Sequence, residues 1–294
     1  MKKNIGRDNK FNIIWIPLWK CNFKCVYCQG WRNTNGLEFQ PFNIIKEVFD
    51  RFFDKIYEYK AKDDFIDFVI TGGEPTIYPD IYKIVEYLLG KTDRICICSN
   101  LSFDVKEFLK MNFPEDKVNI SATYHSSCMN IENFINNLMP LKKYMKEESV
   151  MFVADNDNLK KQKEMVSKIN AFGIKVNPLC LKYMGQQDKD MQDGQKCDSL
   201  DILNSDEEKE IVKSIRQEQK INVSDYESAD ESPFGKKCLA GYKYIQIFPN
   251  GNIRKCTLDM DFLGNIFDGD IKLYKSPEVC RQKICTHQYD NIIE

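Results

Sequence analysis

The chain has 294 residues, of which 43% are hydrophobic and 29% charged, and its formal net charge is −2. This length and composition are ordinary for a globular protein with one sizeable domain and a small second one. The sequence lacks the strongly basic character of nucleic-acid-binding proteins, and no apolar run reaches the roughly 20 residues that cross a bilayer. We therefore expect no nucleic-acid partner and no membrane partner. Because the N-terminus also has no apolar signal core, we expect a cytoplasmic protein.

Strand-like and helix-like segments alternate through the first two thirds of the chain. The predicted strands are 13–17, 68–71, 94–99, 118–123, 150–154 and 174–178, and the predicted helices are 42–59, 79–89, 105–111, 131–145 and 159–171. The first helix has an apolar face of Ile44, Ile45, Val48, Phe49, Phe52 and Phe53. This alternation predicts an α/β fold with a parallel sheet, here a partial (β/α)6 TIM-like barrel. Active sites of such barrels lie at the carboxyl ends of the strands.

The last third of the chain has a different pattern. Residues 179–204 lack periodicity and are interpreted as a connector, and residues 205–219 predict a helix. Residues 242–248 alternate like a strand, a turn signal follows, and residues 253–255 return, which predicts a β-hairpin. We therefore divide the chain into a barrel domain over 1–204, a connecting helix and linker over 205–237, and a small hairpin-bearing extension over 238–294.

Three cysteines stand close together just after the first predicted strand. Cys21, Cys25 and Cys28 form a C-x3-C-x2-C loop, which is short enough to bring three thiolates to one metal centre. A four-iron cluster normally takes four cysteine ligands, so three leave one iron open for chemistry. The alternatives are a zinc knuckle or three buried thiols, although zinc usually takes two ligands from each side of a long loop. Twelve cysteines in a reducing cytoplasm also favour metal ligation over disulfides.

A glycine turn with a carboxylate follows the second predicted strand. Residues 67–75 read Asp-Phe-Val-Ile-Thr-Gly-Gly-Glu-Pro. Gly72 and Gly73 let the backbone come close to a ligand, and Glu74 can face an ammonium group. Together with the cysteine loop, this motif resembles the radical S-adenosylmethionine (SAM) superfamily. Both motifs follow predicted strands, so both are expected on the same edge of the sheet.

The resemblance implies two cofactors and a set of residues that hold them. A 4Fe-4S cluster would be held by the three loop cysteines, and SAM would chelate its open iron. The resemblance implies that SAM is contacted by Tyr27, near the adenine, by Gly72, Gly73, Glu74 and Pro75, at the methionine amino group, and by Asn100, Ser121 and Thr123, at the ribose and carboxylate. A polar residue in a strand can also simply be satisfied by backbone, which is the alternative for the last three.

Four further cysteines are spread over the C-terminal extension. They are Cys238, Cys256, Cys280 and Cys285, and the predicted hairpin brings the first two towards each other. Four thiolates satisfy either a second 4Fe-4S cluster or a zinc ion, and the spacing leaves both metals open. The chain is similar here to radical SAM enzymes with a Twitch or SPASM extension, whose C-x(9–15)-G-x4-C signature matches Cys238, Gly251 and Cys256. Four cysteines imply one auxiliary cluster, which fits the Twitch form, with Cys197 and His287 as reserve ligands.

Two residues at the end of the fourth predicted strand are candidates for proton transfer. His125 is one of only two histidines and is expected on the active edge, where it could contact SAM, and Tyr124 precedes it. The alternative for His125 is an ordinary polar loop residue.

Further cysteines and cations are interpreted as structural. Cys96 and Cys98 alternate along one strand, which indicates the core, and Cys128 is interpreted as unliganded. Arg254 and Lys255 next to Cys256 are interpreted as solvated, with an anionic substrate as the alternative partner.

The resemblance implies an enzyme that cleaves SAM reductively to a 5′-deoxyadenosyl radical, which takes a hydrogen atom from a substrate. The expected reaction is oxidation, with the auxiliary cluster as electron acceptor and a flavodoxin or ferredoxin as electron donor. Only about twenty residues precede Cys21, which favours a small metabolite such as a sugar, cyclitol or nucleotide. The alternatives are a maturase for a ribosomally made peptide or protein, and an iron–sulfur electron carrier or scaffold without catalysis.

Overall fold

Six strands pair in parallel, in chain order, along the first 180 residues. The computed structural model describes residues 9–25, 28, 39–145, 150–154, 159–180, 206–219, 232–259, 261–282, 285 and 292–293. The strands are β1 (Lys10–Trp15), β2 (Phe65–Ile70), β3 (Arg94–Ser99), β4 (Val118–Tyr124), β5 (Val150–Ala154) and β6 (Val176–Cys180). Each pairs only with parallel neighbours within this set. The prediction of an α/β fold with a parallel sheet is confirmed.

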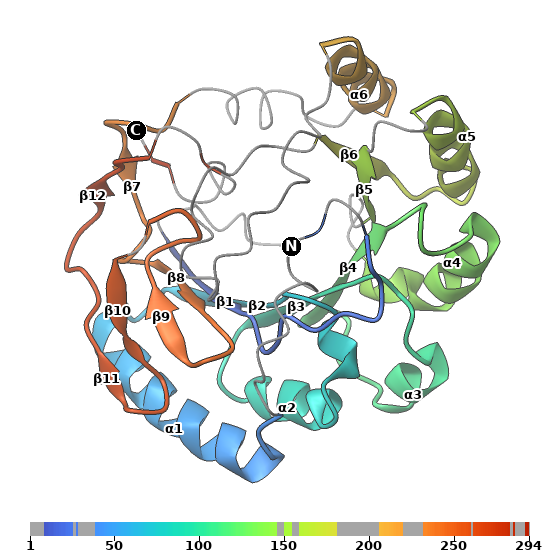
Figure 1. The fold of residues 1–294 in the computed structure, drawn as a ribbon. Helices are drawn as coiled ribbons and strands as arrows, with labels where there is room; N and C mark the ends of the chain where they lie inside the picture. Colours follow the sequence, from blue (N-terminus) through green and yellow to red (C-terminus); the bar gives the residue numbers. More distant parts are fainter. Residues whose placement is uncertain are drawn as a thin grey trace.

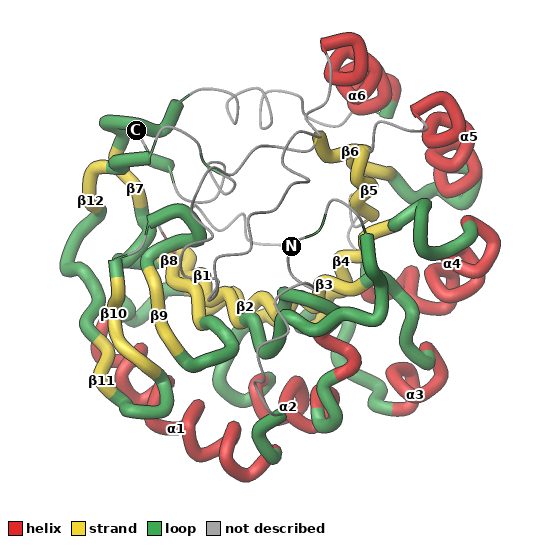
Figure 2. The backbone as a smooth tube through the Cα atoms, viewed as in Figure 1, coloured by secondary structure: helices red, strands yellow, loops and turns green. Residues whose placement is uncertain are grey.

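The helices cover one side of this sheet. They are α1 (Phe42–Tyr59), α2 (Ile81–Leu88), α3 (Val105–Lys110), α4 (Ile131–Leu138), α5 (Leu159–Asn170) and α6 (Asp206–Glu218). Figure 1 shows the strands following an arc with these helices along its outer side, and Figure 2 shows the same two layers as strand and helix colours. We call the sheet surface that faces away from the helices the inner face. None of the described helices is long and apolar enough to span a membrane.

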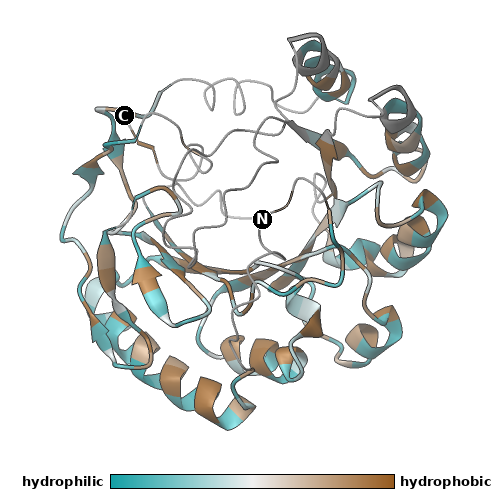
Figure 3. Cartoon of the chain, in the orientation of Figure 1, coloured by the Kyte–Doolittle hydropathy of each residue, from teal (hydrophilic) through white to brown (hydrophobic). Residues whose placement is uncertain are grey.

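Period-two burial along the strands separates the two faces. In β3, Ile95 and Ile97 are buried in the core between sheet and helices, whereas Cys96 and Cys98 point the other way and are half-buried. Helix α1 meets this core with Phe49 and five further buried apolar side chains. Figure 3 shows brown and teal mixed along the helices, and brown stretches on the strands inside the arc of helices. Ile44, which was expected on the apolar face of α1, is 37% exposed, because the face is narrower than the sequence suggested.

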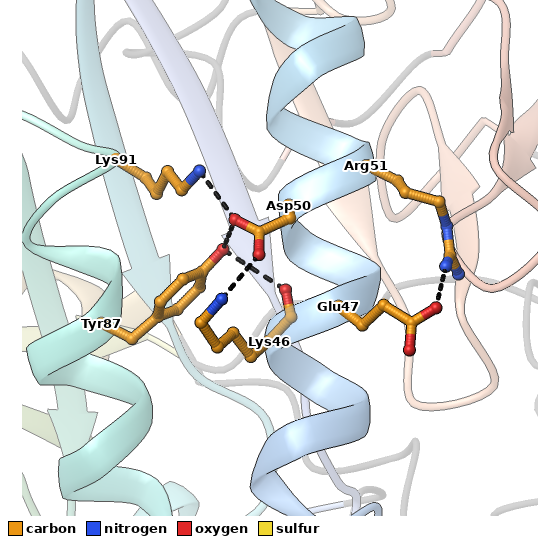
Figure 4. Close-up of polar contacts among 6 residues, drawn as sticks. All are labelled: Lys46, Glu47, Asp50, Arg51, Tyr87 and Lys91. Atoms are coloured by element: carbon orange, nitrogen blue, oxygen red, sulfur yellow. Dashed lines mark hydrogen bonds and ion pairs between the residues drawn. The ribbon is translucent and has the colours of Figure 1, made fainter.

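A polar cluster joins α1 to α2 at the surface of this core. The Asp50 carboxylate is bound by Lys46 at 2.9 Å, by the Tyr87 hydroxyl at 2.7 Å and by Lys91 at 2.7 Å (Figure 4). The hydrogen bonds from Lys91 and Lys46 hold the pKa of Asp50 well below its usual range. The exposed pair of Glu47 and Arg51 in the same figure stays within α1.

The C-terminal hairpin continues the main sheet. Strands β8 (Tyr244–Ile247), β9 (Asn252–Arg254), β10 (Phe262–Asn265) and β11 (Asp270–Ile271) follow one another antiparallel, and β8 lies parallel beside β1. The order of the ten-stranded sheet is therefore β11-β10-β9-β8-β1-β2-β3-β4-β5-β6. A separate pair joins β7 (Lys237–Cys238) to β12 (Glu278–Val279).

One helix departs from the sequence expectation, and another confirms it. The helix expected over 131–145 is α-helical only to Leu138 and continues as a 3-10 helix over Met139–Tyr144, because Pro140 has no backbone N–H for the α-helical pattern. Helix α6 confirms the connecting helix predicted over 205–219, and it packs against β6. The Gln219 side chain, just after the end of α6, accepts from the Val176 N–H and donates to the Val176 carbonyl, both at 2.7 Å. These bonds occupy backbone groups of Val176 at the edge of the sheet.

Candidate functional site

The three loop cysteines lie just beyond the carboxyl end of β1. Cys25 is 4% exposed, and Cys21 and Cys28 are half-buried. A turn in which the Cys28 amide donates to the Cys25 carbonyl at 3.1 Å brings the last two together. Tyr27, the expected adenine neighbour, lies outside the described residues.

Hydrogen-bond donors point at the Cys21 sulfur. The Phe23 amide lies 3.3 Å from Cys21 Sγ, and Asn100 Nδ2 lies 3.8 Å from it. Burial raises the pKa of the Cys21 thiol, and the Phe23 amide works in the opposite direction. N–H donors of this kind favour a thiolate, and they surround the sulfurs of iron–sulfur ligands. Asn100, expected to contact SAM, therefore also supports a loop cysteine.

The loop after β2 is bound directly to the segment that leads into the cysteines. The Gly73 amide donates to the Leu18 carbonyl at 2.9 Å, and the Glu74 amide donates to the Lys20 carbonyl at 3.0 Å. A Cβ at Gly73 would lie 2.0 Å from the Lys20 oxygen, and one at Gly72 would lie 2.5 Å from the Leu18 oxygen. The two glycines are therefore needed for the close approach of this chain to itself, whatever ligand they also face.

The Glu74 carboxylate is buried and already surrounded by donors. Its Oε1 accepts from the Thr76 hydroxyl at 2.5 Å and from Ser99 Oγ at 2.8 Å, and its Oε2 accepts from the Asn100 amide at 2.8 Å. Desolvation raises the pKa of Glu74, and these hydrogen bonds oppose the rise. Pro75 is buried and begins the 3-10 helix Pro75–Ile77. The carboxylate thus joins the β2 loop to the end of β3, a function that the sequence did not indicate.

A strip of small polar side chains lines the inner face below these loops. Ser121 and Thr123 are half-buried and alternate with the helix-facing residues of β4, so they lie on the inner face. Their contact with SAM stays a prediction. Cys98 is opposite Ser121 in the β3–β4 register. Its thiol hydrogen-bonds with Cys96, Thr71 and Ser121, and the bond with Cys96 contributes most to lowering its pKa. The expectation that Cys96 and Cys98 belong to the apolar core is wrong, because that core lies on the other face.

The two candidates for proton transfer lie in different surroundings. Tyr124 is 1% exposed and packs against Phe134 and Phe152 in the core between sheet and helices, so it does not reach the inner face. Side chains alternate between the two faces of a strand, and Tyr124 is one residue from Thr123 and three from Ser121, so it points away from both. Its selection as a catalytic candidate is therefore wrong. His125 lies on the site side, with its ring 6.0 Å from that of Phe23. Burial lowers the pKa of His125 to about 4, so the ring is neutral at pH 7.

A fourth cysteine reaches the loop from the other side of the site. Cys128 follows β4 by a turn in which its amide donates to the His125 carbonyl at 3.0 Å. Its Sγ lies 3.6 Å from Cys25 Sγ. The sequence offered no signal for this contact beyond the position of Cys128 after a strand end.

The C-terminal cysteines gather on the inner face of the sheet. Cys238, Cys280 and the half-buried Cys256 pack with Ile14 of β1 and Val69 of β2. Cys238 and Cys280 share a hydrogen bond that raises the pKa of the former thiol and lowers that of the latter. We call these three residues the C-terminal cysteine group. Cys285 is half-buried, and its membership stays a prediction; Cys197 and His287 lie outside the described residues.

Backbone amides point at this group as they do at Cys21. The Ala240 amide lies 3.4 Å from Cys238 Sγ, and the Asp259 amide lies 3.2 Å from Cys256 Sγ. Lys255 is 2% exposed, so the expectation that it is solvated is wrong. In the described part of the chain, no three Cys, His, Asp or Glu side chains are close enough to hold a single metal ion. A four-iron core is larger than one ion, and the thiols with their N–H donors fit its ligand chemistry.

Comparison with known proteins establishes the family. The sequence profile of the Radical SAM superfamily matches residues 16–176, more than half of the chain, so the chain belongs to this superfamily. Membership makes the protein an enzyme and implies a 4Fe-4S cluster and SAM as its cofactors.

Two curated relatives are similar in sequence to the chain and carry different names. The antilisterial bacteriocin subtilosin biosynthesis protein AlbA of Bacillus subtilis is 23% identical over 287 residues, covering 88% of this chain and 58% of AlbA. The 7-carboxy-7-deazaguanine synthase of Neisseria meningitidis is 24% identical over 200 residues, covering 68% of this chain and 78% of the synthase. The chain thus spans little more than half the length of AlbA.

Solved structures share the fold at low sequence identity. The structure of anSMEcpe with bound AdoMet has a TM-score of 0.58 at 12% identity, covering 87% of this chain and 75% of that one. Streptococcus suis SuiB bound to the precursor peptide SuiA has a TM-score of 0.56 at 14% identity, covering 89% and 63%.

Proposed function

We propose that Cys21, Cys25 and Cys28 hold the 4Fe-4S cluster that binds SAM. The donors at Cys21 and the backbone links from Gly73 and Glu74 support this, because they hold the cysteine loop against the end of β2. Asn100, Ser121 and Thr123 would contact SAM from the ends of β3 and β4, at the open end of what we interpret as a partial barrel. When bound, the cluster supplies the electron that cleaves SAM to methionine and a 5′-deoxyadenosyl radical.

The C-terminal cysteine group would hold a second centre, with Cys285 as the fourth ligand and a Twitch-type extension around it. The observation that carries this proposal is the packing of Cys238 and Cys280 against Ile14 on the inner face. A centre in this place faces the same interior as Ser121 and Thr123, so both centres can serve one substrate. The proposed reaction is an oxidation in which the substrate loses a hydrogen atom to the radical, then a proton and one electron, which the second centre accepts.

Two substrate classes are supported by different relatives. A ribosomally made peptide is favoured by AlbA, because a match over 88% of the chain is longer than the six parallel strands and their helices, which end at residue 180. A small metabolite is the second candidate, favoured by the match to a deazaguanine synthase. We put the peptide first because the AlbA match covers 88% of the chain, whereas the synthase match covers 68%.

The test measures 5′-deoxyadenosine release and product formation by the anaerobically reconstituted, reduced enzyme. Substrate fractions of a cell extract, separated into peptides and small metabolites, identify the class that stimulates release. Combined replacement of Cys21, Cys25 and Cys28 by Ala should abolish release, whereas Cys238→Ala should keep SAM cleavage and lose the oxidised product. Release by the triple variant would overturn the first assignment, and full turnover by Cys238→Ala would overturn the second.

Metal analysis separates the remaining alternatives. A zinc ion at the C-terminal cysteine group would leave one cluster per chain and a diamagnetic second site. An electron carrier or scaffold would hold iron but release no 5′-deoxyadenosine with any fraction.

A further inference from the structure

A buried lysine lies directly beside the C-terminal cysteine group. Lys255 precedes Cys256 at the end of β9, and its side chain is 2% exposed. Its stem packs near Gly241, where a Cβ would lie 3.3 Å from Lys255 Cγ. A charged ammonium is rarely this deeply buried unless negative charge lies close to it.

The surroundings of this ammonium balance its charge only in part. Lys255 Nζ lies 3.1 Å from Asp259 Oδ2, at a distance that makes an ion pair. The geometry is not that of a hydrogen bond, and among the described residues Nζ has no hydrogen-bond acceptor. The Tyr274 ring lies 5.5 Å away and offers its π-face. Nζ therefore keeps N–H groups that no described side chain accepts.

The C-terminal cysteine group lies on the other side of Asp259 from this ammonium. Lys255 directly precedes Cys256 in the chain, and Asp259 bridges the two residues: its carboxylate lies 3.1 Å from Lys255 Nζ and its backbone amide lies 3.2 Å from Cys256 Sγ. As ligands of a metal centre these cysteines would be thiolates, whose negative charge a buried ammonium balances.

We propose that Lys255 is the buried counter-cation of the C-terminal cysteine group and raises the reduction potential of the centre held there. The inference rests on the second iron–sulfur centre proposed above. Each electron that such a centre accepts adds one negative charge, which a fixed positive charge nearby stabilises. The Asp259 carboxylate is negative and lowers the reduction potential, so the opposing effects of Lys255 and Asp259 together set its value. Lys255 would thus act on the centre through its charge, as a positioning residue.

The test is a redox titration of the second centre, followed by electron paramagnetic resonance. The full-length chain carries Cys21→Ala, Cys25→Ala and Cys28→Ala, so that only the second centre contributes a signal. Lys255→Met removes the cation and keeps an unbranched side chain. Asp259→Asn removes the carboxylate charge and keeps the backbone amide of residue 259, which lies 3.2 Å from Cys256 Sγ.

Lys243→Met is the matched control. Lys243 is also a buried lysine of the C-terminal region, and its Nζ pairs with Asp64 of the main sheet's side at 2.7 Å instead of with Asp259. A general loss of packing would appear in this variant as well, whereas loss of a local counter-cation would not.

We expect Lys255→Met to make reduction of the second centre at least about tenfold less favourable. This corresponds to a fall of about 59 mV in its one-electron reduction potential. Asp259→Asn should shift the potential upwards, and Lys243→Met should leave it in place. Opposite shifts cannot come from a purely structural role. Equal potentials in all four proteins, each with a full second cluster, would overturn the inference for Lys255. Absence of a second cluster even with Lys255 intact would instead overturn the proposed centre.

Discussion

The backbone of Gly73 lies so close to Lys20 that a single added carbon would meet the Lys20 carbonyl oxygen at 2.0 Å. Two backbone hydrogen bonds, from Gly73 to Leu18 and from Glu74 to Lys20, run beside this contact. The glycine turn and the cysteine loop are therefore parts of one rigid unit, although about fifty residues separate them in the sequence.

Gly73→Ala should disrupt this unit. The new methyl group must displace backbone, which typically costs about 1–3 kcal/mol, and the cysteine loop should lose its support. We expect a lower free energy of unfolding and less iron per chain after reconstitution. Gly90→Ala is the control, because its Cβ would meet the Tyr87 oxygen at an ordinary 3.5 Å. Equal behaviour of the two variants would show that the close approach is not needed.

Cys25 and Cys128 should form a disulfide when the cluster-free protein is oxidised. Their sulfurs lie 3.6 Å apart, and hydrogen peroxide can take one hydrogen from each thiol, yielding a disulfide and two waters. Peptide mapping by mass spectrometry should find the 25–128 cross-link, and Cys128→Ser should remain able to take up iron after the same treatment. A cross-link that forms equally in the cluster-loaded enzyme would contradict the assignment of Cys25 as a ligand.

Stability should fall in mild acid because of His125. Its folded pKa of about 4 lies below the ordinary 6.5, so the unfolded chain binds the proton first as the pH falls. The neutral ring therefore contributes stability that is fully present above pH 6.5 and is lost towards pH 4. Between pH 7 and pH 5, the cluster-free wild-type protein should lose roughly 1–2 kcal/mol more than His125→Asn in urea unfolding. Parallel losses in both proteins would exclude this explanation.

The cluster around Asp50 should matter more than the exposed ion pair beside it. Asp50→Ala leaves Lys46, Tyr87 and Lys91 without their shared acceptor, and we expect it to destabilise the protein by about 1 kcal/mol. Glu47→Ala removes only a surface pair within α1 and should change stability by less than about 0.5 kcal/mol. Because the folded pKa of Asp50 is depressed, its contribution should disappear as the pH falls through that pKa. Chemical denaturation of both variants at neutral and acid pH measures the difference.

Local patterns were sufficient to predict the parallel half of the protein. Helix α1 and strands β3 and β5 begin and end where periodicity and composition placed them, because burial on one face of an element leaves a regular trace in sequence. The expectation that both motifs follow strand ends depends only on this order of elements, and the structure binds Gly73 and Glu74 to Leu18 and Lys20, just before Cys21. The identity of the superfamily likewise followed from two short motifs.

Only the tertiary structure decided which of these residues face one another. Nothing local to Tyr244 shows that its strand lies beside β1, because strand pairing depends on partners far away in the chain. The same holds for the donors around Glu74, for the exclusion of Tyr124 from the inner face and for the contact of Cys128 with Cys25. Lys255 looks like any surface lysine in sequence, and its burial follows from how β9, Asp259 and Tyr274 enclose it. Side-chain type is encoded locally, whereas burial and charge balance are set by the packing of distant segments.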